Sequence, residues 1–218
     1  MNYLLLLFSL IDFTLLGWAI LQRQLYHPRL LFLCCMLFGM FYDNLIQGIG
    51  NWLIDASWYE AANVPRFILH AGVLPFLTLF ALSIMRAAGS SAGNNVVFSA
   101  FCVVFTTVAL IFGLYHEAYL LELTPNVALG VQKLGSASNL PPIATILTNI
   151  LILPMAAMVW RASGWRWFFL GSLFIFLLNG ATGAQPWGFL TGNLAEVIFI
   201  LALLSTHRHF HVVSEKQY

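Results

Sequence analysis

Long apolar runs dominate the chain, and short segments with charged or turn-forming residues separate them. A helix that crosses a bilayer needs about 20 mostly apolar residues. The runs do not alternate between apolar and polar residues as the strands of an outer-membrane barrel do. The pattern therefore predicts seven transmembrane helices, at Tyr3–Leu21, Leu30–Gly50, Arg66–Met85, Val96–Tyr115, Ile143–Trp160, Trp167–Gln185 and Gly188–Thr206.

Proline positions refine these boundaries. Pro28, Pro65 and the Pro141–Pro142 pair come just before predicted helix starts, where the missing N–H group costs little. Pro75 and Pro154 fall inside predicted helices, so we expect a kink in each.

The distribution of Lys and Arg predicts the orientation. Only Arg66 and Lys133 fall in or beside connections on one side, and seven basic residues fall on the other: Arg23, Arg29, Arg86, Arg161, Arg166, Arg208 and Lys216. Cytoplasmic connections carry the excess of positive charge. We therefore expect an outside N-terminus and a cytoplasmic C-terminus in the plasma membrane. The chain is then a single all-α transmembrane domain over residues 1–218, of which 207–218 form a short cytoplasmic tail.

Composition narrows the class of protein. Of 218 residues, 61% are hydrophobic and only 8% are charged, and the mean hydropathy is +0.87. These values exclude a soluble enzyme and a disordered chain. A formal net charge of +1 supplies no basic field for phosphates, so no nucleic-acid partner is expected. The expected partners are the lipid bilayer and a hydrophobic small-molecule substrate, and the sequence predicts no oligomeric state.

Several polar residues fall inside the predicted spans at similar depths. Asp43, Asn149, Asn179 and Glu196 lie roughly 9–12 Å from the outer helix ends, and Asp12 lies about 13 Å deep. A charged side chain that faces lipid at such depths costs several kcal/mol. We therefore expect these residues to face a common polar pocket that opens toward the outer side.

Asp43, Glu196 and His70 are the candidate catalytic residues. In a low-dielectric pocket, one carboxyl group can keep its proton at neutral pH and donate it to a substrate, while the other stabilises positive charge. His70 would tune or relay the proton. In the structural alternative, the carboxyl groups only bind Arg66, His70, an asparagine or the helix backbone. Asp12 fits a role in the site and an interhelical hydrogen bond equally well.

The candidate substrate-binding residues are Asn44, Arg66, His116, Glu117, Asn149, Asn179 and Asn193. Arg66 suits an anionic head group, or an ion pair with Asp43 or Glu60. His70 and His116 could ligate one haem between two helices, but the second histidine pair typical of a transmembrane haem protein is absent from the sequence. The histidines at 207, 209 and 211 are interpreted as a solvated cluster rather than a chelating one. No metal and no other cofactor is therefore expected.

Two connections on the predicted outer side are candidate covers for the pocket. The segment 51–64 combines aromatic and acidic residues and suits a short interfacial helix. The segment 115–140 is the longest connection, and a connection of this length is usually functional or folded onto the rest of the protein.

In length, helix count and the presence of an acid on the second and seventh helices, the chain resembles the small seven-helix membrane terpene cyclases of fungal and bacterial meroterpenoid and indole-terpenoid pathways, the paxilline type among them. Asp43 and Glu196 match those acids by position. The resemblance implies a cyclase that protonates an epoxide or alkene and lets a carbocation cascade run in an apolar pocket. Those cyclases carry Trp-Glu on the second helix, where this chain has Tyr42-Asp43-Asn44.

Three functions fit the sequence. The first is an intramembrane enzyme that uses acid–base chemistry on an isoprenoid or lipid substrate. The second is a proton-coupled transporter of a small molecule, although no inverted repeat and no polar path through the cytoplasmic half are visible. The third is a noncatalytic subunit or assembly factor of a membrane complex. A retinal Schiff base is excluded, because the last predicted span contains no lysine.

Overall fold

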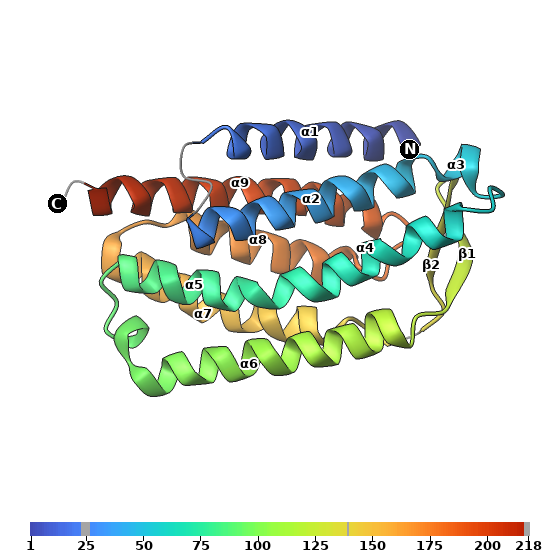
Figure 1. Ribbon diagram of the computed structural model, residues 1–218. Coiled ribbons are helices and arrows are strands. Elements are labelled where there is room, and N and C mark those ends of the chain that lie inside the picture. Colours follow the sequence, from blue (N-terminus) through green and yellow to red (C-terminus); the bar gives the residue numbers. More distant parts are fainter. Residues whose placement is uncertain (23–26, 139, 216–218) are drawn as a thin grey trace.

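The computed structural model describes residues 1–22, 27–138 and 140–215, and most of them are helical (Figure 1). The helices form an elongated bundle that carries a small β-hairpin at one end. In chain order the elements are α1 (Asn2–Ile20), α2 (Pro28–Gly48), α3 (Gly50–Leu53), α4 (Tyr59–Val73), a 3₁₀ turn (Leu74–Phe76), α5 (Leu77–Ala87), a second 3₁₀ turn (Ala92–Asn94), α6 (Val96–Leu114), a π-helical turn (Tyr115–Tyr119), β1 (Leu123–Ala128), β2 (Val131–Ser136), α7 (Ile143–Ser163), α8 (Trp167–Thr182) and α9 (Gly188–Glu215).

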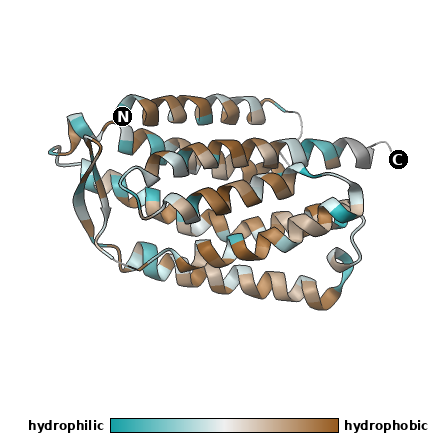
Figure 2. Cartoon of the chain, turned by 180° about the vertical axis from the view of Figure 1, so that it is seen from behind, coloured by the Kyte–Doolittle hydropathy of each residue, from teal (hydrophilic) through white to brown (hydrophobic). Residues whose placement is uncertain are grey.

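Six helical segments of the described residues are long and apolar enough to cross a membrane: Asn2–Ile20, Pro28–Gly48, Tyr59–Ala87, Val96–Tyr119, Ile143–Ser163 and Gly188–His211. They coincide with six of the predicted spans, and α8 coincides with the seventh but has only 16 residues. Figure 2 shows hydrophobic residues along the middle of the helices and hydrophilic residues toward the two ends of the bundle. These features are compatible with a multi-pass membrane protein.

The prediction of an all-α chain is wrong for the longest connection. Strands β1 and β2 pair antiparallel, from Leu123 opposite Ser136 to Ala128 opposite Val131. Leu129 and Gly130 form a two-residue turn, and both have positive φ angles, of 49° and 76°. Turns of this kind match the twist of the paired strands. The hairpin covers one end of the bundle, which we call the hairpin end (Figure 1).

The segment 51–64 also differs from its prediction. It contains the short helix α3, and then α4 begins at Tyr59, so that Pro65 lies inside α4 instead of just before its start. Tyr59 is fully buried, and its hydroxyl donates a hydrogen bond of 2.8 Å to the Ile46 carbonyl oxygen of α2. This anchor holds the first turn of α4 against α2, and it explains why the helix starts earlier than the proline indicated.

The two internal prolines behave differently. Pro75 lies in the 3₁₀ turn between α4 and α5, as expected for a proline that interrupts a helix. Its carbonyl oxygen lies 3.4 Å from the Thr106 hydroxyl of α6. Pro154 lies within one continuous helix, α7.

Helix α8 runs antiparallel to α9 over most of its length. Near its start, the Trp165 indole N–H donates to the Thr206 hydroxyl at 3.0 Å, and at its end the hydroxyls of Thr182 and Thr191 are 2.8 Å apart. Between these contacts the two backbones lie so close together that a Cβ added at Gly171 would be only 2.6 Å from the Ala202 Cβ.

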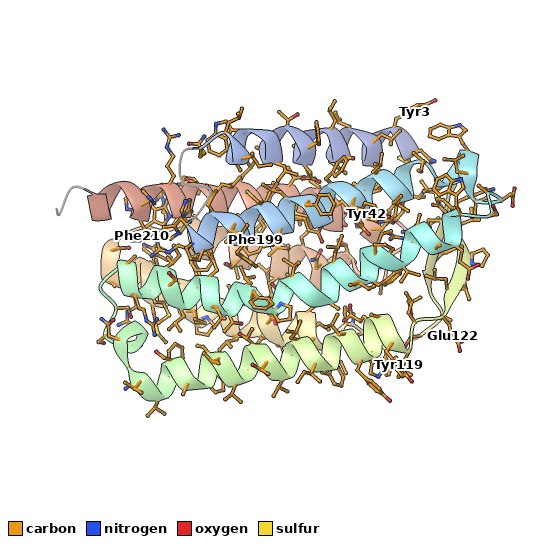
Figure 3. The ribbon with its side chains drawn as sticks, in the orientation of Figure 1. Tyr3, Tyr42, Tyr119, Glu122, Phe199 and Phe210 are labelled. Atoms are coloured by element: carbon orange, nitrogen blue, oxygen red, sulfur yellow. The ribbon has the colours of Figure 1, made fainter. Side chains whose placement is uncertain are left out.

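Side-chain packing divides the bundle into two regions. A large apolar core, formed by α1, α2, α5, α6, α7, α8 and α9, fills the half away from the hairpin and includes Leu33, Ile84 and Leu203. A small core of Ile46, Tyr59 and Leu134 lies under the hairpin. In Figure 3, Tyr119 and Glu122 lie near the hairpin end and Phe210 lies near the opposite end.

Helix α9 continues to Glu215, so residues 207–215 of the predicted tail are helical, and 216–218 lie outside the described residues. His207 is only 4% exposed, and its ring packs on His27 and His211 at centroid distances of 5.3 and 5.7 Å. Burial lowers the pKa of His27, with Arg29 and His211 contributing in the same direction. The interpretation of 207, 209 and 211 as a solvated cluster is therefore wrong for His207.

Candidate functional site

Arg66 of α4 is the centre of a polar network at the hairpin end of the bundle. Its Nε donates to Asp43 Oδ1 of α2 at 2.7 Å. Its Nη1 donates to Asn63 Oδ1 at 2.6 Å and to the Leu134 carbonyl oxygen of β2 at 3.0 Å. The side chain of Arg66 is 8% exposed and that of Asp43 is 29% exposed. One guanidinium group therefore joins α2, α4 and the hairpin.

Gln47 and Lys133 extend the network from α2 to α9. The Gln47 amide donates to Asp43 Oδ2, and its carbonyl oxygen accepts from Lys133 Nζ at 3.1 Å. Lys133 Nζ also lies 3.8 Å from the ring centroid of Phe189, near the start of α9, where it makes a cation–π contact. Lys133 is a residue of β2, so this strand contacts the three long helices α2, α4 and α9 through Leu134 and Lys133 together.

A second clamp fixes the hairpin from its turn. Asn51 of α3 donates from Nδ2 to the Gly130 carbonyl oxygen at 2.7 Å and accepts from the Gln132 backbone N–H. Gly50 leaves the necessary room, because a Cβ at this position would collide with the Gln132 carbonyl oxygen. The longest connection is thus a docked cover, held by side chains of α3 and α4.

Asp12 of α1 lies beside this network but is enclosed within the bundle. It is fully buried, and its Oδ2 accepts a hydrogen bond of 3.0 Å from Asn44 Nδ2 of α2. Asp12 Oδ1 and Asn44 Oδ1 are buried without a hydrogen-bond partner. The interhelical hydrogen bond anticipated for Asp12 is therefore present, and two acceptor oxygens beside it remain unsatisfied.

Glu196 of α9 completes a group of three carboxyl groups. Asp12 and Asp43 both lie close enough to Glu196 to interact with it electrostatically. Glu196 makes no hydrogen bond to any of the described residues, in contrast to Asp43, which is paired with Arg66. We call Asp12, Asp43 and Glu196 the acid cluster. Within it, Asp43 has the strongest counter-charge and Glu196 has the fewest polar partners.

His70, His116 and Glu117 form a separate group between α4, the π-helical turn and α7. His70 is exposed, and its Nε2 lies 3.1 Å from the Thr145 hydroxyl of α7. Glu117 interacts electrostatically with His70 and His116. Although Arg66 and His70 are four residues apart, Arg66 binds Asp43, whereas the neighbours of His70 are Thr145 and Glu117.

The predicted asparagines are dispersed. Asn44 belongs to the acid cluster through Asp12, as described above. Asn149 and Asn193 donate to carbonyl oxygens of their own helices, at Thr145 and Phe189. Asn179 is exposed near the end of α8, and a Cβ added at Gly192 of α9 would lie 3.4 Å from its Oδ1. Of the predicted site residues, the structure thus brings together Asp43, Asn44, Arg66 and Glu196.

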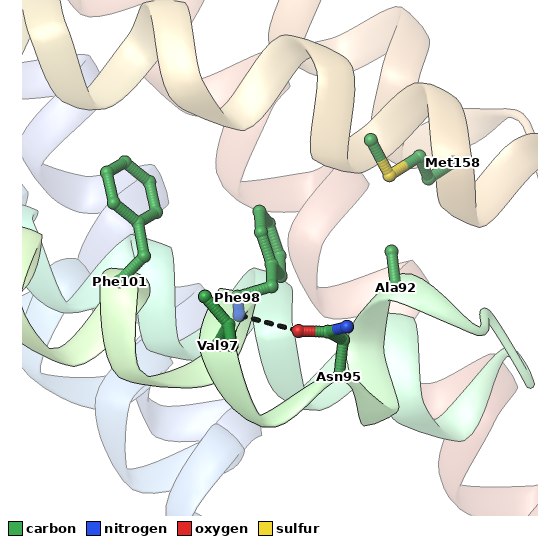
Figure 4. A pocket seen from close by; sticks show the side chains of 6 residues that line it. All are labelled: Ala92, Asn95, Val97, Phe98, Phe101 and Met158. Atoms are coloured by element: carbon green, nitrogen blue, oxygen red, sulfur yellow. Dashed lines mark hydrogen bonds between the residues drawn. The ribbon is translucent and has the colours of Figure 1, made fainter.

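Two surface grooves lie away from the acid cluster. The first, of about 600 Å³, lies where α6 begins and faces α7 (Figure 4). Its lining consists of Ala92, Asn95, Val97, Phe98, Phe101 and Met158. Asn95 caps α6 there by accepting from the Phe98 N–H. The second, of about 490 Å³, lies between α1 and α9. Neither groove includes Asp43 or Glu196.

No group of three or more His, Cys, Asp or Glu side chains among the described residues is arranged to hold a metal ion.

Three members of the network are not among the candidate site residues that the sequence indicates. Gln47 is one of them, and Lys133 contributes there only to the predicted orientation. Asn63 gave no signal, because it lay in a predicted connection. The spacing Asn63-x-x-Arg66 places both side chains on one helix face, but only if the helix starts before Pro65.

The ion pair at the centre of the network leads to a stability prediction. Arg66→Met leaves the Asp43 carboxylate without its guanidinium partner, and the free energy of unfolding in detergent is expected to fall by about 3 kcal/mol. Asp43→Asn combined with Arg66→Met should cost clearly less than the sum of the two single changes. Arg161→Met, at an exposed site, serves as control and should change stability by less than about 0.5 kcal/mol. Additive losses would contradict the pairing.

Lys133 leads to a pH-dependence prediction. Burial, followed by the positive charge of Arg66, lowers the pKa of Lys133 from 10.5 to about 8, against the opposing effect of Asp43. Between these pH values the unfolded chain binds more protons than the folded chain, so stability should rise with pH. The free energy of unfolding in detergent would be measured as a function of pH for the wild type and for Lys133→Met. The difference between the two proteins isolates the contribution of Lys133, and it is expected to grow by at most about 3 kcal/mol between pH 8 and pH 10.5. A difference that stays flat or falls over this range would overturn the assignment.

Comparisons with known proteins identify no relative of this chain. No family model matches the chain, and neither the curated proteins nor the solved structures include a match. The resemblance to membrane terpene cyclases has no support from these comparisons. Any function must therefore be argued from the residues of this chain.

Proposed function

We propose that the protein is an intramembrane enzyme that uses acid–base chemistry on a lipid-soluble substrate, of isoprenoid or lipid type, in the plasma membrane. The observation that supports this proposal is the acid cluster, in which three carboxyl groups lie together within α1, α2 and α9, helices long and apolar enough to cross a membrane. Intramembrane ionisable groups are costly and are mostly retained for function. Arg66 is the only cation among the described residues in direct ion-pair contact with the cluster.

The contacts divide the roles within the cluster. Asp43 is the member of the cluster that contacts a guanidinium group, and we assign it the role of stabilising positive charge on a substrate. Glu196 has no such partner and is the candidate general acid. His70 is assigned a lesser role, because its neighbours are Thr145 and Glu117.

The packing of the opposite half favours an enzyme over a proton-coupled transporter. A transporter must open to both sides of the membrane in turn. Here the half away from the hairpin is filled by the large apolar core, and fully buried Leu33, Ile84 and Leu203 contribute to it. The hairpin, docked through Arg66 and Lys133, covers the other end, so a lipid-soluble substrate would enter laterally from the lipid.

We also propose that α8 crosses the membrane, which gives seven spans with an outside N-terminus and a cytoplasmic C-terminus. The contacts from Trp165–Thr206 to Thr182–Thr191 extend over about 22 Å of α9. The hairpin end is then the outer side. This arrangement retains the excess of Lys and Arg on the cytoplasmic side.

Substitution of the acids tests the enzymatic proposal. Glu196→Gln removes the proton donor while keeping the shape of the side chain, and loss of a general acid typically lowers a rate by about 10²–10⁴-fold. Lipid extracts of cells that express the wild type or a variant would be compared by mass spectrometry. A species converted by the wild type should accumulate unchanged with Glu196→Gln and with Asp43→Asn, at equal folded yield. Glu122→Gln, an exposed acid outside the cluster, is the matched control. Identical lipid profiles for wild type and both acid variants would refute the proposal.

Cysteine labelling tests the number of spans and their orientation. In a background with Cys34, Cys35 and Cys102 replaced by alanine, single cysteines would be placed at the exposed positions Ser163 and Gln185, on either side of α8. A membrane-impermeant maleimide should label Gln185→Cys in intact cells and Ser163→Cys only after permeabilisation. Labelling of both from one side would show that α8 does not cross, and the reversed pattern would invert the orientation.

A further inference from the structure

The groove between α1 and α9 is lined largely by apolar side chains. Helix α1 lies at the edge of the bundle (Figure 1), where it packs extensively against α2 and less extensively against α9. The resulting groove of about 490 Å³ has Leu15, Leu201 and Leu204 among its lining residues. Leu201 is 46% exposed, so the groove is open to acyl chains along its side. A volume of this size is within the range of ordinary ligand sites.

One end of the groove is polar and positively charged. Arg208, Ser205 and Trp18 line it there. Arg208 and Ser205 are exposed, and neither makes a side-chain hydrogen bond or ion pair to another described residue. No acidic residue lines the groove, so the positive charge of Arg208 is uncompensated within it.

The depth of Arg208 matches that of a phospholipid phosphate. It follows Gly188, the first residue of α9, by about 30 Å of helix, which equals the usual thickness of the hydrocarbon core. Leu201 lies about 10 Å further into the membrane than Arg208. Trp18, 41% exposed, is the kind of side chain that prefers the membrane interface.

From these observations we infer that the groove between α1 and α9 binds an anionic phospholipid, whose phosphate contacts Arg208 and Ser205 and whose acyl chains pack along Leu15, Leu201 and Leu204. A zwitterionic lipid also has a phosphate, but its ammonium group would meet no carboxylate in the groove. The inference depends on α1 and α9 crossing the bilayer and is independent of the chemistry at the acid cluster.

Native mass spectrometry of the full chain in a mild detergent tests this site. The protein would be titrated with phosphatidylglycerol and, separately, with phosphatidylcholine of the same acyl chains. The wild type should retain phosphatidylglycerol in preference, and Arg208→Gln should weaken this binding about fivefold while leaving phosphatidylcholine unchanged. The matched control is Arg161→Gln, an exposed arginine at the end of α7 that does not line the groove.

Leu201→Trp provides a second, independent variant, because it fills the groove while keeping Arg208. Retention of both lipids should fall in this variant. An equal loss of phosphatidylglycerol with Arg161→Gln and Arg208→Gln would indicate general surface electrostatics and overturn the site. Unchanged retention with Leu201→Trp would do the same. The acid-cluster proposal would be untouched by either result, because Glu196 is intact in all these variants.

Discussion

The guanidinium group of Arg66 is the constraint on which the hairpin end of this protein depends. It is almost fully removed from solvent, and a buried charge is tolerated only when a counter-charge and further hydrogen bonds compensate for the lost hydration. Asp43, Asn63 and the Leu134 carbonyl oxygen supply that compensation from α2, α4 and β2. The hydrogen bonds and the ion pair that the buried Arg66 side chain requires therefore fix the relative positions of two helices and a strand.

The hairpin gives the bundle two unlike ends. At one end, Arg66, Lys133 and Asn51 hold a polar cover over the helices and over the acid cluster. Toward the other end, the helices are joined by a closely packed apolar core. Acid–base chemistry needs polar groups in a water-poor setting with controlled access. This asymmetry provides such a setting at the hairpin end only, and for this reason it favours local chemistry over passage through the bundle.

Helix α1 connects the two sites proposed for this protein. One of its faces contributes Asp12 to the acid cluster through the bond to Asn44. A second face, one to two turns further along, borders the groove that ends at Arg208. Because α1 lies at the edge of the bundle, it can present a buried acid inward and an apolar wall to the lipid at the same time.

The sequence by itself determined the membrane character, the positions of the long helices and the candidate acids, because these follow from local hydropathy and from the cost of burying charge. It did not determine the hairpin. Pro125 and Asn126 are poor strand residues, and Leu129 is not a typical turn residue, so the strands form only because docking onto Asn51, Arg66 and Gln47 stabilises them. The pairing of Asp43 with Arg66 instead of with His70 was also decided by tertiary structure. Helical spacing places Arg66 and His70 on one face, but α4 packs against α2 and α6, and the two side chains reach different partners.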